Sequence, residues 1–157
     1  MHFGTEYLRQ VQSIEEVAVA APVARDLDCA PGTRWLRISS LRLDTGGEGG
    51  PIGWTDLYVD PAYSEVRDLV RESPGTLVSS LIAERYGRQI VEIHQDVRAD
   101  IVRDAAMAKA LQVEQGAAAL KIVRRYLDAE GLAFEVSVSV HPADRFSVSM
   151  RLQRSAS

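Results

Sequence analysis

The sequence contains an internal repeat, and this repeat limits the possible folds more than any other feature of the sequence. Residues 27–44 return as residues 111–128 at an offset of 84 positions, and the match continues over residues 50–61 at an offset of 81. The matching pairs are Leu27/Leu111, Gly32/Gly116, Leu36/Leu120, Ile38/Ile122, Leu43/Leu127, Asp44/Asp128, Gly50/Gly131, Val59/Val140 and Pro61/Pro142. Two copies of so long a unit exclude a solenoid, which needs three or more short repeats. We therefore predict one domain built from two related halves, and the cleft between such halves is a natural place for a ligand.

Size and charge narrow the classes of protein further. A chain of 157 residues is long enough for one domain with its own core. The net charge of −4 argues against direct binding of nucleic acid, because phosphate recognition normally leaves a basic footprint. The single cysteine, Cys29, cannot form an internal disulfide. No apolar run approaches the ~18 residues of a membrane span, and the first residues lack the apolar core of a signal peptide. A cytoplasmic protein without membrane contact is expected.

Local patterns predict six strands and several short helices. The strands are expected over residues 33–43, 52–59, 89–99, 117–127, 132–140 and 146–152. The helices are expected from Ser13, over 22–27, after Asp60, over 77–86 and from Asp104. Ser13 opens a capping box, and Asp60 precedes a proline that suits the first turn of a helix. Local hairpins and few crossover helices predict an α+β fold with a mostly antiparallel six-stranded sheet, flanking helices and an internal pseudo-repeat.

The first long strand and its repeat both change from apolar to polar along one face. Because side chains alternate in a strand, these faces consist of Leu36, Ile38, Ser40 and Arg42 in the first copy and Leu120, Ile122, Arg124 and Tyr126 in the second. A buried arginine is unfavourable unless it is paired or binds an anion. Either each strand leaves the core and ends in solvent, or the two ends line a polar cleft. In such a cleft the guanidinium groups would meet a carboxylate or phosphate.

The segment over residues 134–141 alternates without interruption. One face carries Glu135, Ser137, Ser139 and His141, and the other carries Phe134 and three valines. The polar row is compatible with a solvated outer surface. It is equally compatible with a pocket for a sugar or an amino acid, which needs a few well-placed polar groups. The sequence leaves both interpretations open.

No catalytic or metal-binding motif is present in the sequence. The glycines at 46–50 precede a strand rather than a helix, so they do not form a phosphate-binding loop. His2, His94 and His141 have neither the spacing of a zinc site nor a place in a catalytic triad. We therefore expect no metal and no cofactor.

Several short motifs follow one another in an order typical of one family. They are Gly32-Thr33-Arg34-Trp35-Leu36, Leu41-Arg42, Pro51-Ile52, Tyr58, Pro61, Glu84-Arg85-Tyr86-Gly87, Gln95, Ala99, Arg124-Arg125-Tyr126, Gly131, Phe134-Glu135-Val136-Ser137 and His141-Pro142-Ala143-Asp144-Arg145-Phe146. This series resembles the UTRA domain, the effector-binding half of HutC-type GntR regulators, which shares its fold with chorismate lyase. The resemblance covers about residues 14–153 and implies that residues 1–157 form a single effector-binding domain. It also implies an N-terminal winged-helix DNA-binding domain, which is missing from this sequence.

The resemblance assigns roles to four positions. Arg42 matches an arginine that contacts the anionic group of the effector. Thr76 lies where relatives place a hydroxyl at a helix start, close to the acidic end of the ligand. Glu135 matches a glutamate that holds ligand hydroxyls or an amine, and His141 replaces a residue, often tyrosine, over the same pocket.

Two departures from the family pattern bear on the ligand. Ser40 and Thr55 stand where sugar-phosphate-sensing relatives often carry a second arginine and a glutamate. A carboxylate such as an amino acid or a urocanate-like acid is therefore at least as good a candidate as a phosphosugar. Trp54 adds an aromatic surface for stacking. Arg124 and Ser137 complete the candidate effector-binding residues.

The leading prediction is the effector-binding domain of a bacterial transcription regulator, acting as a homodimer and reaching DNA only through the missing domain. The alternative is an enzyme of the chorismate lyase type, in which Arg42 and Arg124 hold the carboxylates and Glu135 donates a proton. A third hypothesis is that the chain is a purely structural dimerisation module. The polar strand ends differ between the two copies, as do Trp54 and Glu135, which the offset of 81 makes repeat partners. An asymmetric ligand in a pseudo-symmetric cleft is expected.

Overall fold

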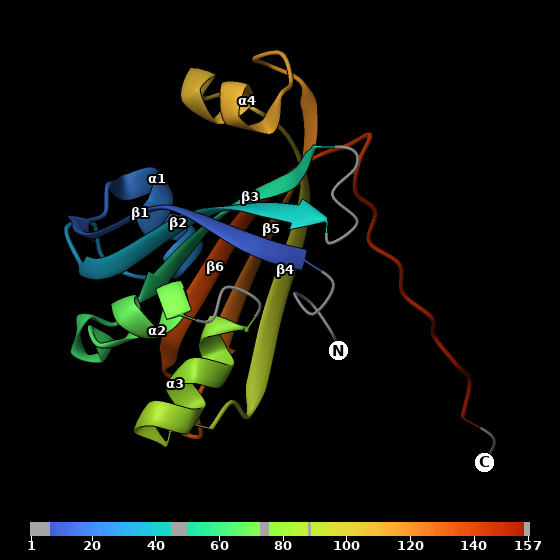
Figure 1. Cartoon of the computed structure of the whole chain (residues 1–157). Coiled ribbons are helices and arrows are strands. Elements are labelled where there is room, and N and C mark those ends of the chain that lie inside the picture. The colour runs from blue at the N-terminus through green and yellow to red at the C-terminus, as the bar shows by residue number, and fades with distance from the viewer. Residues whose placement is uncertain (1–6, 45–49, 73–75, 88, 156–157) are drawn as a thin grey trace.

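A single six-stranded sheet organises the described part of the chain (Figure 1). The computed structural model describes residues 7–44, 50–72, 76–87 and 89–155. Its strands are β1 (Tyr7–Ala18), β2 (Arg34–Asp44), β3 (Pro51–Val59), β4 (Glu92–Ile101), β5 (Ala118–Leu127) and β6 (Ala133–Pro142). They lie in the order β1-β2-β3-β6-β5-β4, and every neighbouring pair is antiparallel. The predicted α+β class with an antiparallel six-stranded sheet is confirmed.

The sixth strand is not the predicted one. Ser13 and the residues after it do not begin a helix, because they lie in β1 and pair with β2 as a sheet edge. The apolar residues Val11, Ile14 and Val17 of β1 pack against the sheet core instead of forming a helical stripe. Residues 146–152, predicted as a strand, have no regular secondary structure. Both errors concern whether a segment finds a pairing partner, which local patterns do not reveal.

Helices cover both faces of the sheet. On one face, α1 (Ala21–Leu27) and α4 (Ala105–Leu111) pack against side chains that include Trp35, Tyr58 and Leu41. On the other face, the short 3₁₀ turn η1 (Pro61–Tyr63), α2 (Val66–Glu72) and α3 (Val78–Tyr86) follow β3, and α2 and α3 cover the largest core cluster. Figure 1 shows α2 and α3 together at one end of the sheet and α4 at the other. The two faces are called the α2–α3 face and the α1–α4 face below.

The predicted pseudo-repeat appears in the backbone itself. Helix α4 lies 84 positions after α1, and both helices end in a left-handed residue, Asp28 with φ 56° and Gln112 with φ 59°. Gly32 and Gly116 follow with φ of 89° and 91°, conformations that glycine adopts without steric penalty. The halves are β1-α1-β2-β3 and β4-α4-β5-β6, so β3 and β6 meet at the centre of the sheet.

Strand pairing gives the offset of the repeat in the second hairpin. Leu36 pairs with Val59, and its counterpart Leu120 pairs with His141, so Val59 corresponds to His141 with an offset of 82. The offset of 81 seen in the sequence is therefore wrong by one residue for these strands. In a sheet a one-residue slip moves a side chain to the other face.

Candidate functional site

A cavity of about 60 Å³ lies on the α2–α3 face, between the sheet and the start of α3. Its lining comes from both halves of the repeat: Arg42, Thr55 and Leu57 from the first, and Ile122, Arg124, Tyr126, Glu135, Ser137, Ser139 and His141 from the second. Leu77, Val78 and Phe146 complete it. The polar strand ends therefore face a pocket that the two halves form together. The interpretation of these ends as a cleft, rather than as solvent-exposed termini, fits this arrangement.

Arg42 provides a positive charge at the first-half wall of the pocket. Its Nε donates a hydrogen bond of 3.3 Å to Oγ1 of Thr55 on the neighbouring strand. Thr55 in turn lies 3.1 Å from Oγ of Ser139, which links β3 to β6 across the centre of the sheet. Burial lowers the pKa of the Arg42 guanidinium, while Tyr126 and Glu135 nearby act in the opposite direction. The guanidinium nevertheless stays cationic near neutral pH, because arginine is effectively always protonated in proteins.

Glu135 is the least satisfied polar side chain of the pocket. It is only 2% exposed, and its Oε1 has no hydrogen-bond partner among the described residues. Burial raises its pKa to about 8, although Arg42 and Arg9 both favour the charged form. A buried carboxyl oxygen without a partner is unfavourable by roughly 1–3 kcal/mol. A ligand that donates a hydrogen bond to this oxygen would remove that penalty.

Arg124 is positioned by a residue of the edge strand. Its Nε donates a hydrogen bond of 2.7 Å to Oε1 of Gln95, which pairs with it directly across β4 and β5. Two residues further along the same face, Tyr126 is buried, and burial together with Glu135 raises its pKa. The phenol is therefore neutral and remains available as a hydrogen-bond donor or acceptor.

His141 closes the pocket as a neutral ring. Its Nδ1 lies 2.9 Å from the carbonyl oxygen of Ile52, which can only accept, so Nδ1 carries the proton and Nε2 is an acceptor. Burial lowers the pKa of the ring, against the opposing effect of that hydrogen bond. Phe146 stacks on it with ring centroids 3.8 Å apart. Gly53 makes room for the imidazole, because a Cβ at this position would lie 2.6 Å from Cε1 of His141.

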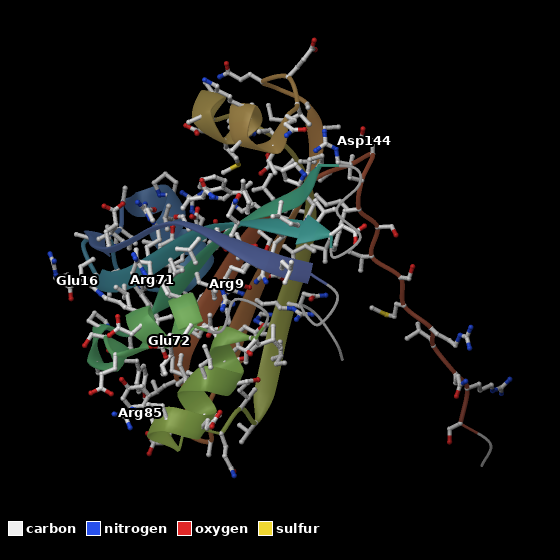
Figure 2. The ribbon with its side chains drawn as sticks, in the orientation of Figure 1. Arg9, Glu16, Arg71, Glu72, Arg85 and Asp144 are labelled. Carbon is white, nitrogen blue, oxygen red and sulfur yellow. The ribbon has the colours of Figure 1, made fainter. Side chains whose placement is uncertain are left out.

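Arg9 is a buried cation that the sequence analysis missed. Figure 2 shows it between β1 and the helices of the α2–α3 face. Its guanidinium donates to the carbonyl oxygens of Thr76 at 2.8 Å and Val70 at 3.4 Å. Burial lowers its pKa to about 10, as does the charge of Arg42, whereas Glu135 raises it. The signal was an arginine two positions before Val11, the spacing that places two side chains on the same face of a strand. The helix predicted from Ser13 obscured it.

Six of the eight predicted site residues line one cavity, and two do not. Arg42, Thr55, Arg124, Glu135, Ser137 and His141 lie together. Trp54 lies on the α1–α4 face, where it packs against the α4 cluster and donates to Asp56 at 3.1 Å. Because Trp54 and Thr55 are consecutive in a strand, they cannot face the same side of the sheet. Thr76 is exposed beside the pocket, and its carbonyl rather than its hydroxyl is engaged, by Arg9.

The corrected register also changes the repeat partner of Glu135. With an offset of 82, Glu135 corresponds to Gly53, and Trp54 corresponds to Val136 on the α1–α4 face. The first half thus carries a glycine where the second carries the buried acid. Likewise Ser40 corresponds to Arg124, and Arg42 to Tyr126. Equivalent backbones carry different polar groups, so the pocket is chemically asymmetric.

Two further observations concern metals and membranes. Among residues 7–44, 50–72, 76–87 and 89–155, no group of three or more His, Cys, Asp or Glu side chains is arranged to hold a metal ion. None of the helices in this described part of the chain is both long enough and apolar enough to cross a membrane.

Known structures of similar shape are domains of bacterial regulators. One is the ligand-binding domain of a protein described as a GntR-family transcriptional regulator from Bordetella bronchiseptica, with a TM-score of 0.77, 17% identity and coverage of 98% of this chain and 93% of that one. The C-terminal domain of the histidine utilization repressor from Pseudomonas syringae pv. tomato has a TM-score of 0.74, 20% identity and coverage of 94% and 99%. The effector domain of PhnF from Mycobacterium smegmatis has a TM-score of 0.75, 15% identity and coverage of 94% and 88%.

Sequence comparison identifies the family. No curated protein sequence matches this chain significantly. Residues 2–147, almost the whole chain, match the family model of the UTRA domain. The resemblance inferred from the ordered motifs is thereby confirmed, and this chain belongs to the UTRA domain family.

Proposed function

We propose that this chain is the effector-binding domain of a GntR-family transcription regulator, in which a small molecule bound on the α2–α3 face changes the affinity of a separate domain for DNA. Family membership and the shared fold of regulator domains support the regulatory role. The observation that carries the site is the buried carboxyl of Glu135, whose Oε1 is unpartnered inside a cavity that also contains Arg42. A ligand that donates a hydrogen bond to this oxygen would stabilise the folded domain, because a buried polar atom without a partner is unfavourable.

The effector should be a compact metabolite with an anionic group and a hydrogen-bond donor at some distance from it. Arg42 and Arg124 offer guanidinium groups to a carboxylate or phosphate. Glu135 offers a carboxyl oxygen to an amine or hydroxyl, and Ser137 and His141 add further polar contacts. The small volume of the cavity favours a ligand of amino-acid or monosaccharide size.

The regulatory output requires parts outside this domain. A net charge of −4 is unsuited to binding DNA phosphates directly, so DNA contact would come from a winged-helix domain joined on the N-terminal side. The whole regulator would act in the cytoplasm as a homodimer. Effector binding would shift the dimer between arrangements with a coupling free energy of ~1–3 kcal/mol.

Thermal denaturation with a metabolite panel tests the site. Amino acids, aromatic acids and sugar phosphates are added in excess, and a ligand that binds only the folded state raises the melting temperature. Arg42→Ala and Glu135→Gln should each abolish most of that rise. Arg37→Ala is the matched control, because Arg37 lies on the same strand but faces the other side of the sheet and pairs with Glu15. A ligand that stabilises all variants equally would remove the pocket from consideration.

The lyase alternative makes a different demand on the same residues. Chorismate turnover would need Glu135 to deliver a proton and Arg42 and Arg124 to hold two carboxylates. An assay for pyruvate release from chorismate distinguishes the two functions. If the domain is regulatory, pyruvate release does not exceed the uncatalysed rate. Robust chorismate turnover that Glu135→Gln abolishes would show instead that the protein is a lyase.

A further inference from the structure

Arg9 connects the N-terminal strand to both helices of the α2–α3 face. It lies near the start of β1 and is only 3% exposed. Its guanidinium donates one hydrogen bond of 2.8 Å to the carbonyl oxygen of Thr76, just before α3, and another of 3.4 Å to that of Val70 in the last turn of α2. In Figure 2 the labelled Arg9 lies between β1 and these helices. One side chain therefore fixes the positions of three elements relative to one another.

The two carbonyl groups that Arg9 contacts lie where the helices need an external partner. Val70 is among the last four residues of α2, whose carbonyl groups have no partner within a helix. Leu77 occupies the N-cap position of α3, and its side chain has no atom that could accept a hydrogen bond from the first turn. Leu77 and Val78 also line the pocket. The hydrogen bond to Thr76 thus helps to determine where this part of the pocket wall lies.

Arg9 is also the direct cross-strand neighbour of Arg42, which lines the pocket. The two residues pair across β1 and β2, so both side chains lie on the same face of the sheet. Like charges in directly opposite positions repel each other, and burial together with the charge of Arg42 lowers the pKa of Arg9. Glu135 offsets this repulsion only in part, because burial raises its pKa to about 8 and leaves the carboxyl mostly neutral at neutral pH. An anionic group bound to Arg42 would supply the missing negative charge.

We propose that Arg9 is a positioning residue of the effector site, through which occupancy of the pocket is transmitted to the start of α3 and to β1. An anion at Arg42 would offset the repulsion between the two arginines and make the buried position of Arg9 more favourable. β1 would then be held more firmly against α2 and α3. A DNA-binding domain joined on the N-terminal side would precede β1 in the chain. This inference rests on the proposed function and gives its regulatory effect a route through named contacts.

Glu135 provides a probe of this coupling that needs no added ligand. Ionisation of its carboxyl places a negative charge near both arginines, as a bound anion would. The charges of Arg42 and Arg9 act on Glu135, which in turn acts on Tyr126, and among the described residues the start of α3 adds only apolar side chains to the pocket lining. A titration from about pH 6.5 to about pH 9.5 spans the pKa of Glu135, which is about 8. The pKa of His141 is lowered and that of Tyr126 is raised, so both lie outside this window.

The first test follows methyl signals of the full chain by nuclear magnetic resonance during this titration. Val78 lines the pocket, whereas Val11 lies on β1 two residues after Arg9 and packs against the core of the same face. In the wild-type chain both signals should shift with a common midpoint near the pKa of Glu135, about 8. In Arg9→Met the Val78 signal should still titrate, but the Val11 signal should lose most of its shift. In Glu135→Gln neither signal should titrate.

Arg71→Met is the matched control, because Arg71 is an exposed arginine next to Val70 on α2, labelled in Figure 2. It should leave both titrations unchanged. If Val11 titrates equally in the wild type and in Arg9→Met, the signal bypasses Arg9. If Val11 stays constant while Val78 titrates, the pocket and β1 are not coupled, and if Val78 does not titrate in the wild type, the charge that drives the coupling is missing. Each of these three results would overturn the proposal.

Hydrogen exchange then separates a positioning residue from a contact that affects only its own strand. Arg9→Met should accelerate amide exchange by about tenfold both in β1 and in the first turn of α3, because one side chain holds both. Arg9→Lys keeps the charge and a hydrogen-bond donor, so it should restore part of the protection and part of the Val11 titration. Faster exchange confined to β1 would contradict a role in positioning α3. All of these measurements use the ligand-free chain, so their failure would leave the proposed effector site standing, and a failed effector screen would not affect them.

Discussion

Glu135 owes its chemistry to its surroundings rather than to its residue type. In solution a glutamate is ionised at neutral pH, but in this fold burial outweighs the two neighbouring guanidinium groups and raises the pKa to about 8. Most of the empty pockets at pH 7 therefore hold a neutral carboxylic acid beside cationic Arg42. Binding of an amine at Glu135 would release a proton, whereas binding of a hydroxyl would not.

The pH dependence of stability should report this group. A carboxyl whose folded pKa is raised binds more protons in the folded state than in the unfolded state between pH ~4.5 and ~8. The free energy of unfolding should therefore fall as pH rises through that window, by at most about 4 kcal/mol, and then level off. Urea unfolding at pH 5 and pH 8.5 measures the fall. Glu135→Gln should flatten it, and an equal slope in the variant would mean that another group titrates.

Gly53 and His141 form a second pair whose roles depend on each other. Gly53→Ala should displace the imidazole and break its hydrogen bond to Ile52, lowering the free energy of unfolding by about 2 kcal/mol. His141→Ala removes the ring that the new methyl group would meet. The double variant should thus be more stable than the sum of the single effects predicts, a coupling that a double-mutant cycle in urea quantifies. Simple additivity would contradict the close packing.

The sequence predicted the placement of single residues correctly where the alternation of side chains along a strand is enough to assign each one to a face of the sheet. The row from Glu135 to His141 was recognised because side chains alternate in any strand. The same rule could have separated Trp54 from Thr55. Arg9 could not be placed so easily, because its burial depends on α2 and α3 lying over β1, a contact between segments more than 60 positions apart.

At the scale of elements, the repeated helices α1 and α4 both have an unfavourable backbone conformation at their C-terminal end. Each ends in a left-handed residue with a side chain, Asp28 or Gln112, where glycine is usual. Asp28→Gly and Gln112→Gly should each raise the free energy of unfolding by roughly 0.5–1 kcal/mol, and the two gains should add. Glu114→Gly, at an exposed position without positive φ, is the control and should give no gain. Chemical denaturation of the three single variants and of the Asp28→Gly/Gln112→Gly double variant checks the values.

Elements were predictable from sequence when their partners were close in the chain. The hairpins β2-β3 and β5-β6 and the helices α1, α3 and α4 lie near the predicted positions. β1 was missed because it pairs with β2 beyond α1, and the alternation after Ser13 also suits a helix start. Residues 146–152 have the alternating pattern of a strand, but alternation alone does not supply a pairing partner, and they have no regular secondary structure.

At the scale of the whole molecule, the sheet separates the candidate pocket from both tryptophans. Trp35 and Trp54 lie on the α1–α4 face, away from Arg42 and Glu135. An effector that raises the melting temperature should therefore leave the native tryptophan emission nearly unchanged. Phe146→Trp places an indole in the pocket wall, and its emission should respond to the same ligand. A strong change in the wild-type protein, lost in Trp54→Phe, would instead place the ligand on the α1–α4 face.

The sequence by itself determined the repeated unit, the α+β class and the polar rows of the strands, because these depend on the period of the backbone and on matches along one chain. Tertiary structure decided which residues meet. Pairing between β2 and β3 and between β5 and β6 gave the offset of 82 and made Gly53 the counterpart of Glu135. Packing of α2 and α3 over one face buried Arg9, and burial of Glu135 raised the pKa of its carboxyl group. Burial and charge state arise from contacts distant in sequence, so no local pattern specifies them.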